Sequence, residues 1–599
     1  MADQSGSEIK LPDPAQFGKT MADIAERSQK IVGEFLTRQG ANPEMGFSDP
    51  LNIGGAFFEM TTRMMTDPAK IVEAQMGLWQ NYMALWQNAA QRMMGGDGNP
   101  VANPESGDRR FKDEAWSENA VFDYIKQSYL LTSKWMMGVV TDVDGLDKHT
   151  AEKVEFYTRQ YVDAMAPSNF LLTNPEVIRQ TIESGGENLV KGLENLLGDL
   201  EKGKGNLKIS MTDESAFEVG VNVATTPGKV VFRNDLIELI QYTPSTEEAF
   251  ARPLLIVPPW INKFYILDLR PKNSYIKWAV DQGHTVFCIS WVNPDADMAE
   301  MGFADYMLQG PVAAIDVALK ITGADKVNMA GYCLGGTLVA CTLAYLTAKG
   351  EAGKVASATH FTTMLDFQDP GELGIFIDDQ TLDYIDDQME KKGYLDGSEM
   401  AGTFNMLRSN DLVWSFVVNN YLMGKDPFPF DLLYWNSDST RMPRAMHSFY
   451  LRKMYRENVL KNAGGITLDG VPIDLTAVKT PSYFVSCRED HIAPWISTYA
   501  GSQLYSGPVK FVLAASGHIA GIINPPDKVK YCYWTYNRKV KDPEAWLEKT
   551  TQVEGSWWPD WQEWVTKHAG KPGPVPELGG GSMELLENAP GSYVKARAA

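Results

Sequence analysis

The sequence has 599 residues, of which 44% are hydrophobic and 22% charged, and this globular composition excludes a wholly disordered chain. Acidic residues outnumber basic ones by 76 to 55, so the net charge of −21 argues against nucleic-acid binding through phosphate neutralisation. The five cysteines form neither a disulfide framework nor a zinc motif, and no signal peptide or membrane-spanning apolar run is present. We therefore expect a cytoplasmic protein without a metal site or a membrane span.

The first 205 residues predict an all-helical region. Within it, Met and Trp side chains recur at helical spacing over residues 71–94 and form a broad apolar face. We expect this face to pack within the protein, with a lipid or polymer surface as the alternative. Residues 95–108 are rich in Gly, Asn and Pro and predict a linker.

Residues 206–599 predict a catalytic domain in which short apolar strands alternate with helices. Several of these runs are continuously apolar, which is typical of strands buried on both faces of a mostly parallel, doubly wound α/β sheet. A strand-poor, aromatic-rich stretch at about 367–480 predicts a cap insertion, and a flexible tail is expected from about residue 570. The predicted strands are 229–233, 236–242, 253–258, 285–290, 326–331, 356–365, 482–487 and 509–515.

A candidate nucleophile stands at the end of the predicted strand 326–331. Residues 331–336 read Gly-Tyr-Cys-Leu-Gly-Gly, which is the G-x-S-x-G nucleophile elbow with Cys333 in place of serine. The glycines permit a tight strand-to-helix turn that exposes the thiol at a helix N-terminus. A structural cysteine in a turn is the alternative, and this motif alone does not decide between them.

The order of the remaining candidates supports catalysis. Asp490 follows the next-to-last predicted strand and His518 follows the last one. Nucleophile, acid and histidine in this order are typical of the α/β-hydrolase triad. His491 is the rival histidine and Glu489 the rival acid, but only His518 follows the final strand.

An acyl-transfer site also needs donors for an oxyanion. The backbone N–H of Leu334, directly after the nucleophile, is the first candidate. The second is expected from the loop after the strand 253–258. Because the two prolines that open this loop have no N–H, we expect Trp260 or Ile261 to donate.

Further segments carry a resemblance to a known family: PPWINKFYILDL (258–269), SWVNPD (290–295), GYCLGG (331–336), LRSNDLVWSFVVNNYLMG (407–424), CREDH (487–491), ASGHIAGIINPP (515–526) and GSWWPDW (555–561). With FKDEAW (111–116) and SYLLTSKW (128–135), they make the chain similar to the polyhydroxyalkanoate synthases from about residue 105 onwards. Cys487 departs from the pattern, since serine is common there.

The resemblance implies that Cys333 holds the growing ester as a thioester, that His518 is the general base and that Asp490 is the third catalytic residue. It also implies 3-hydroxyacyl-coenzyme A substrates, storage polyester and free coenzyme A as products, and no metal or other cofactor. Size and the helical region resemble class I enzymes, which prefer short acyl chains, act as homodimers and sit on cytoplasmic polyester granules. The residues that contact coenzyme A are not predicted.

Two other functions remain open at this point. One is an intracellular polyester depolymerase or acyl hydrolase with a cysteine nucleophile. The other is a non-catalytic granule-coat protein, against which the order of the three candidate catalytic residues argues.

Overall fold

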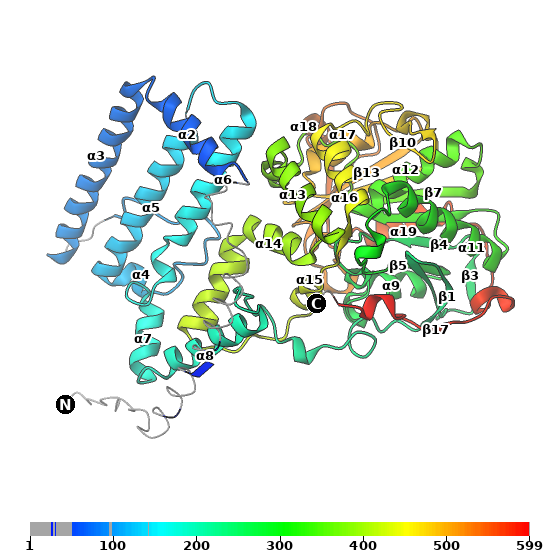
Figure 1. The fold of residues 1–599 in the computed structure, drawn as a ribbon, viewed down its shortest axis with the longest axis horizontal. Coiled ribbons are helices and arrows are strands. Elements are labelled where there is room, and N and C mark those ends of the chain that lie inside the picture. Colours follow the sequence, from blue (N-terminus) through cyan, green and yellow to red (C-terminus); the bar gives the residue numbers. More distant parts are fainter. Residues whose placement is uncertain are drawn as a thin grey trace. The chain divides into compact units, whose positions relative to one another are not determined.

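A computed structural model describes residues 51–94, 99–141 and 143–597, together with Lys19, Glu26, Arg27, Lys30 and Asp49. Most of the first 50 residues of the predicted helical region, and residues 95–98 of the predicted linker, lie outside the described residues. The chain forms two compact units. One comprises residues 1–213 and 403–428, and the other residues 214–402 and 429–599 (Figure 1).

The first unit is helical, as the sequence predicts. In its core, α5 packs between α3 and α6, and α2 packs on α6 (Figure 1). Polar side chains fix where these helices begin: the Asp67 carboxylate accepts the N–H of Lys70 at the start of α3, and Asp147 accepts the N–H of Thr150 at the start of α6. Its helices are α2 (Ile53–Met64), α3 (Pro68–Met93), α4 (Ala115–Glu118), α5 (Ala120–Thr141), α6 (Lys148–Ala164), α7 (Pro175–Glu183) and α8 (Glu187–Lys202).

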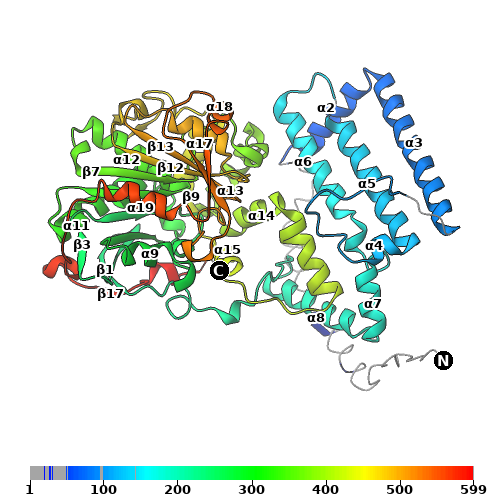
Figure 2. The same ribbon diagram turned by 180° about the vertical axis from the view of Figure 1, so that it is seen from behind.

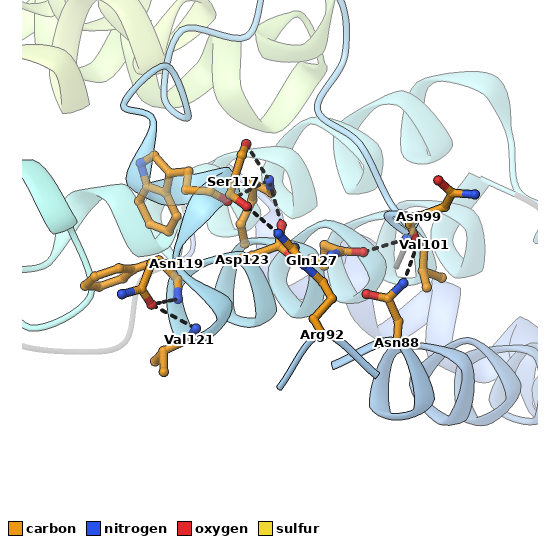
Figure 3. A network of polar contacts seen from close by, with 12 residues as sticks. Asn88, Arg92, Asn99, Val101, Ser117, Asn119, Val121, Asp123 and Gln127 are labelled. Carbon is orange, nitrogen blue, oxygen red and sulfur yellow. Dashed lines mark hydrogen bonds and ion pairs between the residues drawn. The ribbon is translucent and has the colours of Figure 1, made fainter. Parts of the chain in front are cut away.

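A buried polar network fastens α3 to α5 (Figure 3). At its centre the carboxylate of Asp123 pairs with Arg92 of α3 and, at 3.0 Å, with Lys126. Asp123 also accepts the side-chain N–H of Gln127 at 2.6 Å, and Gln127 in turn accepts the backbone N–H of Val101 at 2.6 Å. Because every charge in this network is paired, its burial is tolerated. The network holds both α3 and the segment from residue 99 against α5.

The opposite face of α3 is exposed, and the expectation that its apolar residues pack within the protein is therefore wrong for most of them. Trp79 and Trp86 are 64% and 68% exposed, and Met76 and Met83 are exposed as well. Leu85 is buried on the α5 side. Because an exposed apolar stripe of this length is unusual for a surface helix, it indicates a binding surface.

Residues 403–428 lie inside the predicted cap insertion, yet they belong to the helical unit. The side-chain amide of Asn188 on α8 donates to the carbonyl oxygen of Leu422 at 2.7 Å. Gly192 lies so close to the segment that a Cβ there would stand 1.8 Å from the carbonyl oxygen of Tyr421. The insertion is thus divided between the two units, which its sequence pattern did not indicate.

The second unit is built on one large sheet whose order is β15-β14-β13-β12-β7-β6-β4-β5-β2-β1-β17. From β13 to β5 neighbouring strands are parallel, and antiparallel strands extend both edges. Every predicted strand overlaps an observed one, whereas β14, β15 and β17 were not predicted. The strands of the sheet are β1 (Gly228–Arg233), β2 (Ile237–Tyr242), β4 (Leu254–Val257), β5 (Val286–Trp291), β6 (Val327–Tyr332), β7 (Val355–Phe361), β12 (Ser482–Cys487), β13 (Val509–Ala514), β14 (Cys532–Thr535), β15 (Thr551–Glu554) and β17 (Glu587–Asn588).

Helices cover both faces of this sheet (Figures 1 and 2). The core on one face contains residues of α11 (Ala313–Thr322), α12 (Leu334–Ala348) and α17 (Trp495–Ser502). The core on the other face contains residues of α9 (Tyr275–Asp281) and α19 (Trp558–Thr566). All residues of β4, β5, β6 and β12 are buried, which explains their continuous apolar runs. The predicted doubly wound architecture is confirmed.

The insertion between β7 and β12 is largely helical. Its described strands are only two residues long, in agreement with its weak strand signal. Its elements include α13 (Asp379–Lys392), β8 (Tyr394–Leu395), α14 (Gly397–Leu407), α15 (Asp431–Ser437), β9 (Met442–Pro443), α16 (Arg444–Phe449), a π-helical turn (Tyr450–Arg456), β10 (Thr467–Leu468) and β11 (Val471–Pro472). The unit also contains the short helices α10 (Phe303–Met307) and α18 (Pro543–Leu547).

The expectation of a flexible tail from about residue 570 is wrong. Within it β16 (Pro572–Pro574) pairs with β3 (Glu248–Phe250), and β17 pairs with the edge strand β1. Beyond β17, the buried carboxylate of Glu238 accepts the backbone N–H groups of Ser592 and Tyr593, both at 3.1 Å. Long-range pairing therefore orders a segment whose Pro- and Gly-rich composition is typical of a loop.

Candidate active site

Cys333 stands on a strained turn between β6 and α12. Its φ of 52° and ψ of −122° place a residue with a side chain in the positive-φ half of the backbone map, where strain of about 1–3 kcal/mol is typical of functional sites. Glycines make the turn possible, because a Cβ on Gly331 would lie 2.5 Å from the Cα of Gly336. The N–H of Cys333 donates to the carbonyl oxygen of Phe361 on β7 at 2.8 Å, which fixes the turn against the sheet.

His518 and Asp490 lie on the loops after β13 and β12 and are in direct contact. Nδ1 of His518 stands 2.6 Å from Oδ2 of Asp490. The other carboxylate oxygen of Asp490 accepts the backbone N–H groups of Ile492 and Ala493, both at 2.9 Å. These three hydrogen bonds fix the carboxylate, and through it the orientation of the imidazole.

The electrostatics of His518 link it to the nucleophile. Burial by itself lowers the pKa of the imidazole, but the Asp490 carboxylate and the Cys333 sulfur outweigh it and raise the pKa of His518 to about 10. Hydrogen bonds to both groups act in the same direction. Since Nδ1 faces Asp490, Nε2 is the atom left for Cys333. The arrangement can take a proton from the thiol and stabilise the thiolate that remains.

The structure thus brings Cys333, Asp490 and His518 together. The contact with Asp490 is made by His518 rather than by the rival His491, and the rival acid Glu489 is exposed. Tyr332 also holds the histidine in place, because its ring stacks on the imidazole and its hydroxyl donates to the carbonyl oxygen of His518 at 3.1 Å.

The loop after β4 lies beside the N-terminus of α12. A Cβ on Gly335 would stand 2.2 Å from the carbonyl oxygen of Val257, so the two backbones are in contact. Trp260 is buried, and its carbonyl oxygen and that of Ile261 accept hydrogen bonds from Thr440. Because a trans peptide is planar, the N–H of Ile261 points away from Thr440. Leu334 is buried as the first residue of α12.

Two tyrosines of the insertion face the site and were not predicted. The hydroxyl groups of Tyr450 and Tyr455 are hydrogen-bonded to each other, and their rings meet edge to face at 5.4 Å. Burial raises the pKa of Tyr455, and the nearby charges of Cys333 and Asp490 raise it further. Burial also raises the pKa of Tyr450. Both phenols therefore stay protonated, and because one hydroxyl donates to the other, one O–H is left as a donor beside the thiol. No local sequence motif marks them, since only the folded insertion brings them to the site.

The described part of the chain holds no cluster of three or more His, Cys, Asp or Glu side chains suited to a metal ion. Among the described residues, no helix is both long and apolar enough to span a membrane.

Comparison with known proteins identifies the family. A profile described as "Poly-beta-hydroxybutyrate polymerase (PhaC) N-terminus" matches residues 107–279, and one described as "alpha/beta hydrolase fold" matches residues 258–525. The "Poly(3-hydroxyalkanoate) polymerase subunit PhaC" of Rhizobium meliloti (strain 1021) is 46% identical over 98% of this chain and 96% of its own length. The chain belongs to the poly(3-hydroxyalkanoate) polymerase family.

Other members of the family are equally similar. The "Poly(3-hydroxyalkanoate) polymerase" of Methylorubrum extorquens is 50% identical over 95% of this chain and 93% of its own length. The subunit PhaC of Cupriavidus necator is 45% identical over 89% of each chain. Because the similarity spans both units, the helical unit belongs to the family as much as the hydrolase unit does.

Proposed function

We propose that this protein polymerises 3-hydroxyacyl-coenzyme A, with 3-hydroxybutyryl-coenzyme A as its main substrate, into a polyester and releases coenzyme A. The growing chain is held as a thioester on Cys333, and His518 is the general base. Asp490 orients His518 and stabilises its protonated form. The observation that carries the proposal is the strained turn that presents Cys333 to a histidine fixed by a buried carboxylate.

Acylation begins when His518 takes the thiol proton of Cys333. The thiolate attacks the thioester carbonyl of the substrate, and negative charge develops on the carbonyl oxygen. Backbone N–H groups of Leu334 and of Ile261 or Trp260 are the proposed donors to this oxyanion. As the intermediate collapses, the carbon–sulfur bond to coenzyme A breaks and the departing thiolate takes the proton from His518. The acyl group then resides on Cys333.

Elongation reuses the same base. His518 removes the proton from the 3-hydroxyl group of the next 3-hydroxyacyl-coenzyme A, whose oxygen attacks the thioester on Cys333. An ester bond forms, the thiolate of Cys333 leaves, and the chain, longer by one unit, is a coenzyme A thioester. Cys333 attacks this thioester and releases coenzyme A, which restores the loaded enzyme. Water must be kept out because it would end the chain as a free acid, and the aromatic insertion is suited to exclude it.

The test supplies 3-hydroxybutyryl-coenzyme A and measures both products. Insoluble polymer with one coenzyme A released per unit supports the proposal, whereas free 3-hydroxy acid identifies an acyl hydrolase. Cys333→Ala should abolish release of coenzyme A. Cys341→Ala is the matched control, because Cys341 is a fully buried thiol of α12 whose pKa burial raises to about 12.

We further propose that the protein works in the cytoplasm as a homodimer on polyester granules, where the exposed face of α3 contacts the polymer. Between Glu73 and Arg92 this helix carries no acidic or basic side chain. An uncharged apolar face on a chain of net charge −21 suits an uncharged polyester better than a charged surface.

Granule binding is tested with a double substitution on α3. Trp79→Ser with Trp86→Ser should reduce the fraction of protein that sediments with granules, while polymerisation from soluble substrate stays unchanged. Gln75→Ser with Gln87→Ser, at exposed positions of the same helix, is the control. Equal sedimentation of both variants contradicts the assignment, and analytical ultracentrifugation reports the dimer.

A further inference from the structure

Ala596 is hydrogen-bonded to the loop that follows β4. The ammonium group of Lys263 donates to the carbonyl oxygen of Ala596 at 2.7 Å, and the side-chain amide of Asn293 donates to the same oxygen at 3.3 Å. Lys263 belongs to the loop that carries Trp260 and Ile261. The carbonyl of Ala596 therefore contacts the loop proposed to supply an oxyanion donor.

Lys263 makes this contact from a buried, charged position. Lys263 and Asp438 are only 3% and 4% exposed. The carboxylate of Asp438 accepts a hydrogen bond from the Tyr265 hydroxyl at 2.9 Å, while its other oxygen is buried without a hydrogen-bond partner among the described residues. Burial lowers the pKa of Lys263 to about 8, although the charge of Asp438 opposes this. A desolvated ammonium group of this kind is stable only while it has a hydrogen-bond acceptor, which here is the carbonyl oxygen of Ala596.

Arg597, the residue after Ala596, makes two further contacts. Its guanidinium lies over the ring of Tyr434 at 4.7 Å and donates to the carboxylate of Glu214 at 3.0 Å. Upstream, Val594 is buried in the core on the α9 side of the sheet. Residues 592–597, here called the C-terminal strap, are thus fixed at several points before they reach Lys263.

The loop is held on its other side by the insertion. Thr440 donates to the carbonyl oxygens of Trp260 and Ile261, and the indole N–H of Trp435 donates to the carbonyl oxygen of Lys263 at 2.7 Å. The backbone carbonyls are therefore fixed from one side, and the side chain of Lys263 is fixed from the other by the strap. A short loop clamped in this way has little freedom to rotate its peptide groups.

We propose that the C-terminal strap is a positioning element that sets the direction of the oxyanion donors through Lys263. This inference rests on the proposed function, because an oxyanion arises only when Cys333 attacks an acyl carbonyl. The strap touches no reacting atom. Its effect is to keep the N–H group of Trp260 or Ile261 aimed at the place where charge develops, where small displacements are costly.

The test compares two reactions of the same thiol. Alkylation of Cys333 by iodoacetamide displaces iodide at a saturated carbon and forms no oxyanion, whereas acyl transfer forms one. Lys263→Met removes the ammonium but keeps the apolar stem. We expect alkylation at the wild-type rate and acylation slowed about 10-fold to 100-fold, below the loss of about 10²–10³ for outright removal of a donor. Lys595→Met, at an exposed lysine of the strap, is the matched control and should change neither rate.

Two further measurements keep the test decisive. A chain that ends at Lys595 lacks the Ala596 carbonyl and should reproduce the Lys263→Met result. Acylation is measured both with 3-hydroxybutyryl-coenzyme A and with a p-nitrophenyl ester. If the wild-type protein reacts only with the ester, the polymerase proposal is refuted, but the effect of the strap on acylation can still be measured with the ester. Equal loss of alkylation and acylation indicates a merely structural strap and overturns the inference, as does an unchanged rate of both.

Discussion

Replacement of Asp490 by Asn removes the charge beside His518 and also reverses a hydrogen bond. The N–H groups of Ile492 and Ala493 both donate to Oδ1 of Asp490 at 2.9 Å. An Asn side chain satisfies both donors only with its oxygen in that position, which turns its NH₂ group towards Nδ1 of His518. His518 must then accept at Nδ1 and carry its proton on Nε2. In this tautomer Nε2 has no lone pair for Cys333 or for a substrate hydroxyl.

The size of the effect differs between the two half-reactions. A wrong tautomer in a serine-type triad lowers the rate about 10⁴-fold. A free thiol of pKa about 8.5 ionises without help near pH 9, whereas an alcohol holds its proton about as tightly as water and still needs the base. We therefore expect the first acylation of Asp490→Asn to recover to within about 10-fold of wild type near pH 9. Elongation should stay about 10⁴-fold slower.

The assay is rapid-quench labelling with radioactive 3-hydroxybutyryl-coenzyme A, with acyl units counted per enzyme near pH 7 and near pH 9. Asp490→Asn should hold about one unit at the higher pH and then stall. Glu489→Gln, an exposed carboxylate next in sequence, is the control and should elongate normally. Long polymer from Asp490→Asn, or a first acylation that does not recover with pH, would refute the reasoning.

Three further predictions concern other parts of the chain. Gly192→Ala should destabilise the protein by about 1–3 kcal/mol, because the new Cβ would clash with the carbonyl oxygen of Tyr421. Gly198→Ala on the same helix has free space for a Cβ and should raise the melting temperature slightly. Calorimetry that finds the Gly198 variant less stable than the Gly192 variant contradicts this. Tyr455→Phe should slow acylation up to about 10-fold in stopped-flow assays through loss of a donor beside the thiolate, and an unchanged rate argues against that role. Removal of residues 587–599 should lower the melting temperature, since the buried carboxylate of Glu238 then loses its partners in the tail.

The catalytic part of the fold is well predicted by the sequence because its signals are local. Buried parallel strands are apolar throughout, and each candidate catalytic residue lies within four residues of the end of one of them. Gly331 and Gly336, before and after Cys333, are required because their backbones touch, and both residues belong to the motif itself. Position relative to the last strands also separates His518 from His491, and His518 is the histidine whose Nδ1 lies 2.6 Å from Asp490.

The features that were missed depend on contacts between distant residues. Tyr455 reaches the site from a π-helical turn within an insertion, and neither its type nor its spacing marks it. The short strand β17 is fixed by its pairing with β1, more than 350 residues earlier in the chain, as the contact of Glu587 with Val230 shows. The apolar face of α3 has the same periodicity whether it packs inward or contacts a partner, so periodicity alone cannot distinguish the two.

The division of the insertion between the two units has a consequence for the order of folding during synthesis. The helical unit begins near the N-terminus, but it needs residues 403–428, which emerge about 215 residues after residue 213. At roughly 5–20 residues per second, that delay is on the order of 10–40 seconds. The strands β1 to β7 are made within this interval. The helical unit, although translated first, is therefore completed only after much of the sheet has left the ribosome, and until then the α8 surface around Gly192 lacks its partner.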